Sequence, residues 1–548
     1  MAHYHLDLAR SAAQTELASR LSSLREEFAL PAGFPPEVLA EAEQAAADAV
    51  NRLPVHDRTD LPLLTIDPPG STDLDQAVHL QRGLGSRTHL GEPAGPGSSG
   101  NSGDSGDSGN QDDGFTVHYA IADVPAFIAP GGALDAETMR RGQTVYLPDG
   151  RIPLHPEVIS EDTGSLLPGV DRGAYLWTFG LDRTGAVVST SVERARVRSR
   201  EQLTYQEAQH RIDAGGEPGS TLALLKEVGL LRTRLETDRG GASLRLPEQE
   251  ITATDHGYQV LTAPPLDVED WNAQISLMTG IAAAHIMLDG GVGILRTMPP
   301  ADPDAESTFR ARTRALGHPW PLDQPYGEYL RELDTTRPQE LAIMHAATSL
   351  FRGAGYTAFD GDTPDVTVQS AIASPYAHAT APLRRLVDRF VLASCLALEN
   401  GEEVPQSVRG LLPSLPAAMK GSSLVASRAT NAALDLVEAA SLHGMEGQEF
   451  SAVVISAPSS EQAEKARREG RQPWGEIQVE QPPVLARFEG QAEAGQRIRV
   501  VLVTADMATR TVLFRVAGQT PPPRPAEVPG ADLAPEDHED TVDWPHQG

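Results

Sequence analysis

The sequence predicts an α+β fold in which a large unit of mixed strands and helices is followed by a small C-terminal β-barrel. The chain has 548 residues, of which 40% are hydrophobic, and because this exceeds one ordinary compact core, two or three domains are expected. After residue 444 the helical pattern gives way to short alternating runs. Five such runs are typical of an OB-type barrel, although another small all-β module also fits the pattern. The runs are 449–455, 476–479, 484–488, 497–503 and 511–516.

Residues 1–58 are expected to form a small helical preface. Leu17, Leu21 and Leu24 recur at helical spacing, and a Pro-containing break at 31–36 separates them from a second, Ala/Glu-rich run.

The mixed unit, residues 59–445, carries strand signals first and helix signals later. Thr204 and Glu207 have the spacing of a capping box, which marks the start of one helix. Strands are predicted at 63–66, 77–80 and 115–122, and helices at 221–236, at 271–288, from 383 to 401 and in a last segment that closes at Gly444.

Two segments lack the apolar residues that a packed core needs. Residues 83–114 are rich in Gly, Ser and Asp, so they are predicted to be a disordered insertion within a hairpin. Residues 518–548 are predicted to be an acidic, Pro-rich disordered tail. The barrel domain is accordingly assigned to 446–517.

The overall charge speaks against a general affinity for nucleic acid. The chain has 45 Lys and Arg against 76 Asp and Glu, a formal net charge of −31, which repels a polyanion at long range. Part of the excess need not face a substrate, notably in the tail 521–548, where seven acids meet one arginine, so local charge decides the question.

Cysteine content and hydropathy indicate a soluble cytoplasmic protein. Cys395 is the one cysteine, so the chain forms no internal disulfide and no cysteine zinc site. Residues 1–14 do not resemble a signal peptide, and no apolar stretch is long enough for a membrane span.

The strongest chemical signal is a group of carboxylates at the end of the first predicted strand. Asp67, Asp73 and Asp75 lie within nine residues around a Pro-Pro-Gly loop, and hard divalent cations take several oxygen ligands from such compact loops. A calcium-binding hand is excluded because Val78 occupies its twelfth position. From spacing alone, a metal site and a solvated acidic turn both remain open.

The surrounding motifs resemble, in order, those of ribonuclease II-type catalytic domains. After Asp67-x5-Asp73-x-Asp75 come Ile121-Ala-Asp-Val124, Leu134-Asp-Ala-Glu137, Arg141-Gly142, Val145-Tyr-Leu-Pro148, Ile152-Pro153, Ser165-Leu166 and Tyr376-Ala-His-x-Thr-Ala-Pro-Leu-Arg-Arg385. The chain is thus similar to the ribonuclease II and ribonuclease R family. The resemblance implies an RNB-type catalytic domain around an RNA channel. It also implies Mg²⁺-dependent 3′ to 5′ hydrolysis of single-stranded RNA to nucleoside 5′-monophosphates, with Mn²⁺ as an alternative ion.

The resemblance also implies roles for residues of the acidic loop. Asp67, Asp73 and Asp75 match the family aspartates that position metal and attacking water, and Asp75 is assigned to catalysis. Gln76 stands where the family has a fourth aspartate; its amide oxygen is expected to ligate the metal without adding charge.

On the RNA side, Arg384 matches the arginine that holds the scissile phosphate, and Arg385 follows it as a second RNA contact. Tyr146 matches the aromatic residue that stacks on the terminal nucleotide, and Tyr205 is a weaker match in the channel. Without the resemblance, Tyr146 reads as a core tyrosine and the two arginines as a solvated helix face. The expected partner is single-stranded RNA, with no DNA and no membrane.

Three positions depart from the family pattern: Gln76, Asn272 and Ala433 replace acidic residues. The two cold-shock barrels that precede many family catalytic domains are not expected, because about 60 residues come before Asp67. An active exoribonuclease is the leading hypothesis, and a catalytically weakened RNA-binding or regulatory protein is the alternative. A glycosyltransferase with a metal at Asp73-x-Asp75 leaves 145–153 and the barrel without a role.

Overall fold

The computed structural model describes residues 12–83, 114–244, 248–254, 257–263, 266–457, 464, 468 and 473–519. The predicted insertion, except for its end residues Gly83 and Gly114, and the predicted tail from residue 520 lie outside the described residues.

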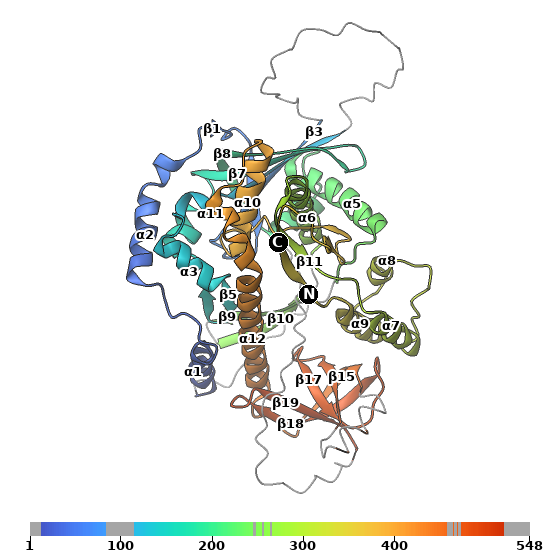
Figure 1. Ribbon diagram of the computed structural model, residues 1–548. Coiled ribbons are helices and arrows are strands. Elements are labelled where there is room, and N and C mark those ends of the chain that lie inside the picture. Colours follow the sequence, from blue (N-terminus) through green and yellow to red (C-terminus); the bar gives the residue numbers. More distant parts are fainter. Residues whose placement is uncertain are drawn as a thin grey trace, which may run out of the picture.

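A six-stranded sheet lies near the top of the large unit in the view of Figure 1. The strand order is β1-β8-β2-β3-β4-β7, and the 18-residue β8 pairs in parallel with β2 and antiparallel with β7. The three predicted strands are confirmed as β2, β3 and β4, whereas β7 and β8 had not been singled out. The strands are β1 His56–Asp57, β2 Leu63–Asp67, β3 Gln76–Arg82, β4 Phe115–Ala122, β7 Asp171–Leu181 and β8 Val187–Thr204.

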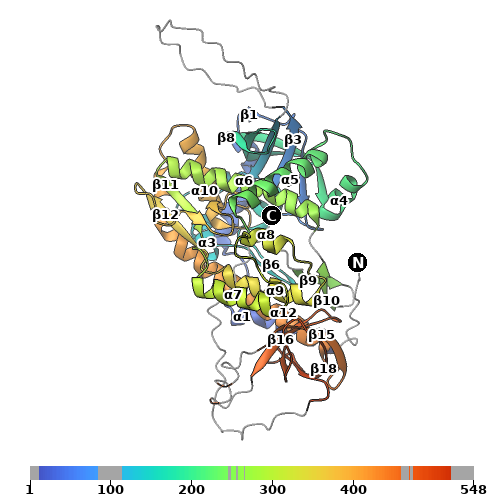
Figure 2. The same ribbon diagram turned by 90° about the vertical axis from the view of Figure 1, so that its right-hand side faces the viewer.

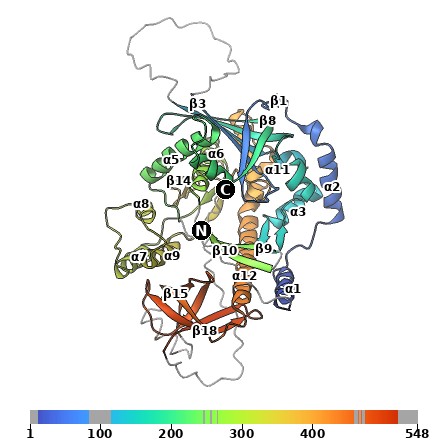
Figure 3. The same cartoon turned by 180° about the vertical axis from the view of Figure 1, so that it is seen from behind.

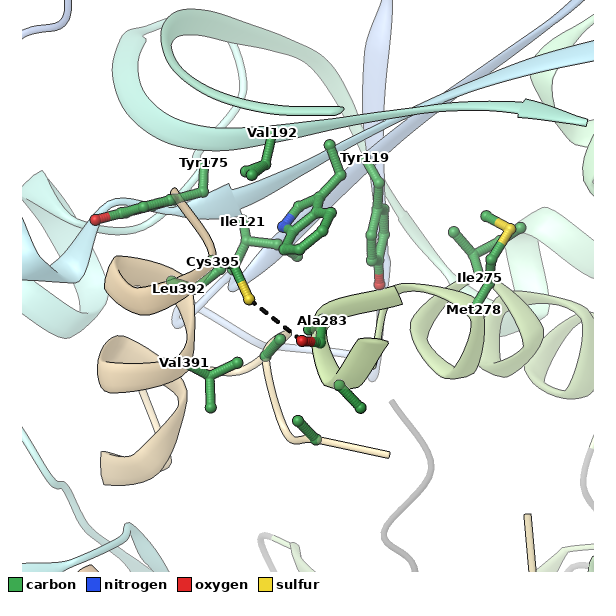
Figure 4. Packing of buried hydrophobic residues seen from close by; sticks show 14 of the residues in the cluster. Tyr119, Ile121, Tyr175, Val192, Ile275, Met278, Ala283, Val391, Leu392 and Cys395 are labelled. Carbon is green, nitrogen blue, oxygen red and sulfur yellow. Dashed lines mark hydrogen bonds between the residues drawn. The ribbon is translucent and has the colours of Figure 1, made fainter. Parts of the chain in front are cut away.

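Successive residues of each strand point to opposite faces of the sheet. Apolar side chains lie on both faces, so helices cover both. On β4, Tyr119 and Ile121 pack against α6 and α10, and in Figure 4 the thiol of Cys395 on α10 reaches the backbone carbonyl of Ala283 on α6. Ala120 and Ala122 of β4 point to the opposite face and pack in a second core with residues of α2 and α3. Figures 1 and 3 show α2 and α3 on the side of the sheet away from α5 and α6.

The predicted helices are confirmed, with bounds that differ by a few residues. Thr204 caps α4 as expected, since its hydroxyl accepts the backbone N–H of Glu207 and the Glu207 carboxylate accepts that of Thr204. In the part of the chain that is described, no helix combines the length and apolarity needed to cross a bilayer. The helices are α1 Ala12–Glu27, α2 Pro36–Ala47, α3 Ala133–Arg141, α4 Tyr205–Asp213, α5 Thr221–Arg239, α6 Asp267–Asp289, α7 Pro303–Ala315, α8 Tyr326–Arg331, α9 Pro338–Ala347, α10 Leu386–Glu399, α11 Gln406–Arg409 and α12 Leu415–Leu442.

The C-terminal strands close into a five-stranded barrel with the order β15-β16-β17-β19-β18. All five predicted runs are strands of this barrel, so the predicted barrel is confirmed. The long helix α12 leads down to it in Figure 1, and α7 and α9 stand above it in Figure 2, where α9 packs on β15. The strands are β15 Glu449–Ser456, β16 Trp474–Val479, β17 Leu485–Glu489, β18 Arg497–Asp506 and β19 Thr511–Val516.

Several short hairpins complete the large unit. One of them, β5 with β6, rests on α1 and α12 through a shared apolar cluster. The short strands are β5 Val145–Leu147, β6 Gly150–Ile152, β9 Glu248–Thr254, β10 Gly257–Ala263, β11 Val292–Thr297, β12 Gly355–Asp360, β13 Val368–Gln369 and β14 Ser374–Pro375.

Candidate active site

The acidic loop, residues 67–75, connects β2 to β3. Its apolar residue Leu74 anchors the loop in the core. Leu74 is fully buried, and its backbone N–H donates to the hydroxyl of Ser165 over 2.9 Å. The Ser165 hydroxyl in turn donates to the carbonyl of Thr72 over 2.7 Å. With Leu74 turned into the core, extended backbone directs its neighbours Asp73 and Asp75 to the other side.

Asp75 is the most buried carboxylate of the loop, with 4% of its surface exposed. Its Oδ1 accepts the backbone N–H of Leu383 over 2.7 Å, and its Oδ2 lies 3.4 Å from Nε of Arg384. Burial raises the pKa of Asp75 well above its usual value, although Arg384 and the Leu383 N–H oppose that rise. The segment before α10 therefore supplies both groups that stabilise the charged form.

Asp67 ends β2, and its Oδ2 is buried with no hydrogen-bond partner among the described residues. Burial raises the pKa of Asp67 to about 6, while Arg384 lowers it and Asp73 raises it further. An unpartnered buried carboxylate oxygen is costly unless a cation or a donor occupies the space beside it. Asp67 therefore has the environment expected of a cation ligand.

Asp73 differs from the other two because protein donors already take both of its oxygens. Its Oδ2 accepts the hydroxyl of Tyr146 over 3.1 Å, and its Oδ1 accepts Nη1 of Arg151 over 2.7 Å. Tyr146 remains 46% exposed, so its ring is a surface feature of the site and not a core tyrosine.

Gln76 is also occupied. Its Oε1 accepts hydrogen bonds from the hydroxyls of Tyr119 on β4 and Ser276 on α6, the second over 3.3 Å. The family resemblance predicted Gln76 as a fourth metal ligand. In the structure, its side chain belongs to a network of hydroxyl groups between the sheet and α6. Within the described ranges, no three His, Cys, Asp or Glu side chains form a group that could hold a metal ion. The expected ligand set is therefore not preassembled, because Arg151 and Tyr146 hold Asp73 while two hydroxyls hold Gln76.

The structure separates the two predicted RNA-contacting arginines. Arg384 is about a third exposed and faces Asp75, whereas Arg385 caps α10 and forms two bonds to Asp388, of 2.5 and 2.8 Å. This double pairing gives Arg385 a structural partner inside the fold.

The remaining predicted positions lie behind the site or in another core. Tyr205 begins α4, packs against the main core, and has its pKa raised to about 12, chiefly by burial. Asn272 is buried on α6, and Ala433 is buried on α12 in the core that also contains α1.

Sequence reasoning missed Arg151 and Glu161. Arg151 lies directly opposite Tyr146 in the β5–β6 hairpin, and Glu161 contacts it from a π-helical turn. The turn-forming residues 148–150 were the available signal, because a hairpin there places 146 and 151 side by side on one face.

Comparison with known proteins places this chain in a class, that of proteins with an RNB-type catalytic domain. The RNB domain family matches residues 55–396, and the RNase II-type exonuclease C-terminal S1 domain matches residues 448–517. The chain therefore belongs to the ribonuclease II and ribonuclease R family, as the ordered motifs had indicated.

Individual relatives are distant. The Homo sapiens exosome complex exonuclease RRP44 is 27% identical over 343 residues, which are 60% of this chain and 33% of that protein. Ribonuclease R of Mycoplasma genitalium, solved with ribose-methylated single-stranded RNA, has a TM-score of 0.73 at 16% identity, covering 91% of this chain and 78% of that one. Yeast Ssd1, described as a pseudonuclease, has a TM-score of 0.61 at 15% identity over 89% and 58%. The chain spans about a third of the human relative, and the shared fold occurs in both a nuclease and a pseudonuclease.

Proposed function

We propose that the chain is a metal-assisted 3′ to 5′ exoribonuclease that hydrolyses single-stranded RNA to nucleoside 5′-monophosphates. The observation that supports this most strongly is the convergence of an exposed aromatic ring, an accessible guanidinium and three carboxylates at one place, through Tyr146, Arg384 and the acidic loop. These are the groups needed to stack a terminal base, hold a phosphate and activate water.

The donor chemistry at Asp67 and Asp75 fits a hard divalent cation. Asp67 Oδ2 lacks a partner among the described residues, and both carboxyls have raised pKa values that a nearby cation would lower. Asp67 and Asp75 would hold Mg²⁺ or Mn²⁺, and Asp73 would join them once Arg151 releases it. The bound ion supplies Lewis-acid activation of water and offsets charge on the phosphate.

The chain's own residues position the RNA. Arg384 can present its guanidinium to two phosphate oxygens at once, and its charge also opposes the rise in the pKa of Asp75 that burial causes. The ring of Tyr146 offers a face to any terminal base without reading its sequence. We assign these contacts to the 59–445 unit, with the 446–517 barrel as a second RNA-binding surface. We place the activity in the cytoplasm, where the lone buried Cys395 is compatible with a reducing compartment.

The test uses matched RNA and DNA oligomers that carry a 5′ label, incubated with Mg²⁺ or Mn²⁺. A ladder that descends one nucleotide at a time from RNA alone is expected, because the 2′-hydroxyl distinguishes the two polymers. Asp75→Asn should abolish hydrolysis and leave RNA affinity nearly unchanged, since it removes a water-positioning carboxylate and no stacking contact. Exposed Asp60→Asn is the control. Equal cleavage of DNA, or internal cuts that appear first, would overturn the proposal.

The second candidate is a catalytically weakened RNA-binding protein on the same fold. The engagement of Gln76 by two hydroxyls and of Asp73 by Arg151 favours it, because the hydroxyls occupy the amide oxygen and the guanidinium offsets the charge of the carboxylate. Tight binding of RNA with no shortening, in either metal and at any protein concentration, would select this candidate.

A further inference from the structure

The β5–β6 hairpin presents two donors to one carboxylate. Tyr146 and Arg151 are directly opposite each other across the hairpin, so their side chains share a face, and both donate to Asp73. Apolar residues on the other face of the hairpin, such as Val145 and Ile152, pack against α1 and α12. The hairpin is thus anchored, and Arg151 is held within reach of Asp73.

Arg151 is itself fixed by further partners. Its Nη2 donates to the hydroxyl of Thr72 over 2.7 Å and forms an ion pair with Glu161, whose carboxylate also accepts the Thr72 hydroxyl over 2.9 Å. Although partial burial lowers the pKa of Arg151, Asp73 and Glu161 raise it above its usual value. A permanently charged guanidinium, 25% exposed, therefore lies between two carboxylates at the edge of the site.

The net charge of the side chains around the site matches in magnitude that of one divalent cation. When all four carboxylates of Asp67, Asp73, Asp75 and Glu161 are ionised, the two guanidiniums of Arg151 and Arg384 leave two negative charges. Each oxygen of Asp73 accepts one hydrogen bond, and one of the two donors carries a full positive charge, so a cation that binds this carboxylate must share it with Arg151 or displace Arg151.

We propose that Arg151 is a built-in cation that competes with the divalent ion for Asp73 and so sets the ion concentration at which the site fills. The inference rests on the proposed function, because it concerns the ion of that same site. Arg151 is a positioning residue in this scheme: it holds Asp73 in place when the site is empty of metal and yields it when the ion binds.

Direct binding of Mn²⁺ to the full chain without RNA tests this, with titration calorimetry or the electron paramagnetic resonance of free Mn²⁺ as readout. Arg151→Gln should lower the Mn²⁺ dissociation constant by about three- to fivefold, the upper part of the range for removing one partly exposed charge pair. Arg151→Lys keeps the charge and should stay within about twofold of the parent chain. Arg25→Gln is a matched control, because Arg25 pairs with Asp149 of the same hairpin, is 26% exposed and does not contact Asp73.

Each outcome decides the inference. Unchanged or weaker Mn²⁺ binding by Arg151→Gln, or an equal change in Arg25→Gln, would overturn it, as would no binding of Mn²⁺ by any form of the chain. Tighter binding by Arg151→Gln alone would support it. If the parent chain binds Mn²⁺ as described but shortens no RNA, the proposed function fails while the role of Arg151 stands.

Discussion

Burial and charge oppose each other at Asp67 and Asp75. Both carboxyls have raised pKa values because their surroundings exclude water, yet both sit where positive charge is at hand in Arg384. Functional sites retain buried carboxylates, although the charged form lowers the free energy of unfolding, because ligand binding or catalysis needs that charge. The cost should be measurable in the absence of metal.

Asp67→Asn should stabilise the metal-free protein at pH 7.5 and have little effect at pH 4. With a folded pKa of about 6 against an ordinary 3.8, the stability contributed by protonated Asp67 is complete below pH 3.8 and is lost as the pH rises through 6. Asparagine mimics the protonated form, so the gain at pH 7.5 should be about 1 to 3 kcal/mol, discounted for the partial exposure of Asp67.

Urea unfolding in EDTA at the two pH values measures this difference, with exposed Asp60→Asn as the control. Stabilisation of equal size at both pH values would show that ionisation of Asp67 is not its source.

Tyr146 is predicted to act through its ring. In an Asp75→Asn background, which prevents hydrolysis, Tyr146→Ala should weaken binding of oligo(A) by about 1 to 3 kcal/mol, the usual contribution of one base stacked on an aromatic ring. Tyr146→Phe should keep most of the affinity, although it loses the bond to Asp73. Fluorescence anisotropy gives both dissociation constants. Equal losses in the two variants would assign the effect to the hydroxyl.

Among the elements, α1 has a role that its position at the start of the chain does not suggest. Its leucines share a core with the β5–β6 hairpin and with α12. Two bidentate ion pairs extend this support: Arg25 binds Asp149 at the hairpin turn, and Glu27 binds Arg510 in the barrel. The helix therefore links the hairpin that carries Tyr146 and Arg151 to the barrel.

Leu21→Ala should destabilise the protein by about 2 to 5 kcal/mol, because Leu21 is fully buried in this shared core and its truncation leaves a cavity. Leu39→Ala, also in a helix but 41% exposed, should cost less than about 1 kcal/mol. Chemical unfolding followed by tryptophan fluorescence compares the two. A similar small loss in both variants would mean that α1 contributes little to the core.

At the scale of the whole molecule, the net charge of −31 works against the proposed substrate. Three arginines of β8 do not offset this repulsion, because each forms an ion pair with an aspartate. They are Arg194, Arg196 and Arg198. Binding must therefore depend on short-range contacts at the site and on added cations.

RNA affinity of the Asp75→Asn chain should fall by at least about tenfold between roughly 50 and 200 mM KCl, because phosphate contacts release counterions that salt opposes. Millimolar Mg²⁺ at low KCl should strengthen binding, since it offsets the repulsion. Anisotropy titrations at several salt concentrations measure both effects. An affinity that does not change with salt would show that the site does not contact phosphates.

The sequence by itself determined the local features: the loop of three aspartates after β2, the capped helix α4, the alternation of the five barrel strands and the order of motifs that identified the family. The first three depend on spacing within a few residues, which periodicity and turn chemistry make readable, and the family follows from the order of such short motifs along residues 67–385. The pairing of Arg385 with Asp388 was also within reach, since the two lie three residues apart at a helix start.

Only the tertiary structure decided which groups meet the carboxylates. Leu383 reaches Asp75 across 308 residues of chain, and Arg151 reaches Asp73 across 78. Gln76 turns to Tyr119 and Ser276, although its place in the motif predicted a metal ligand. Such contacts arise from the packing of separate elements, so no local pattern encodes them. They determine which charged groups and hydrogen-bond donors surround the carboxylates.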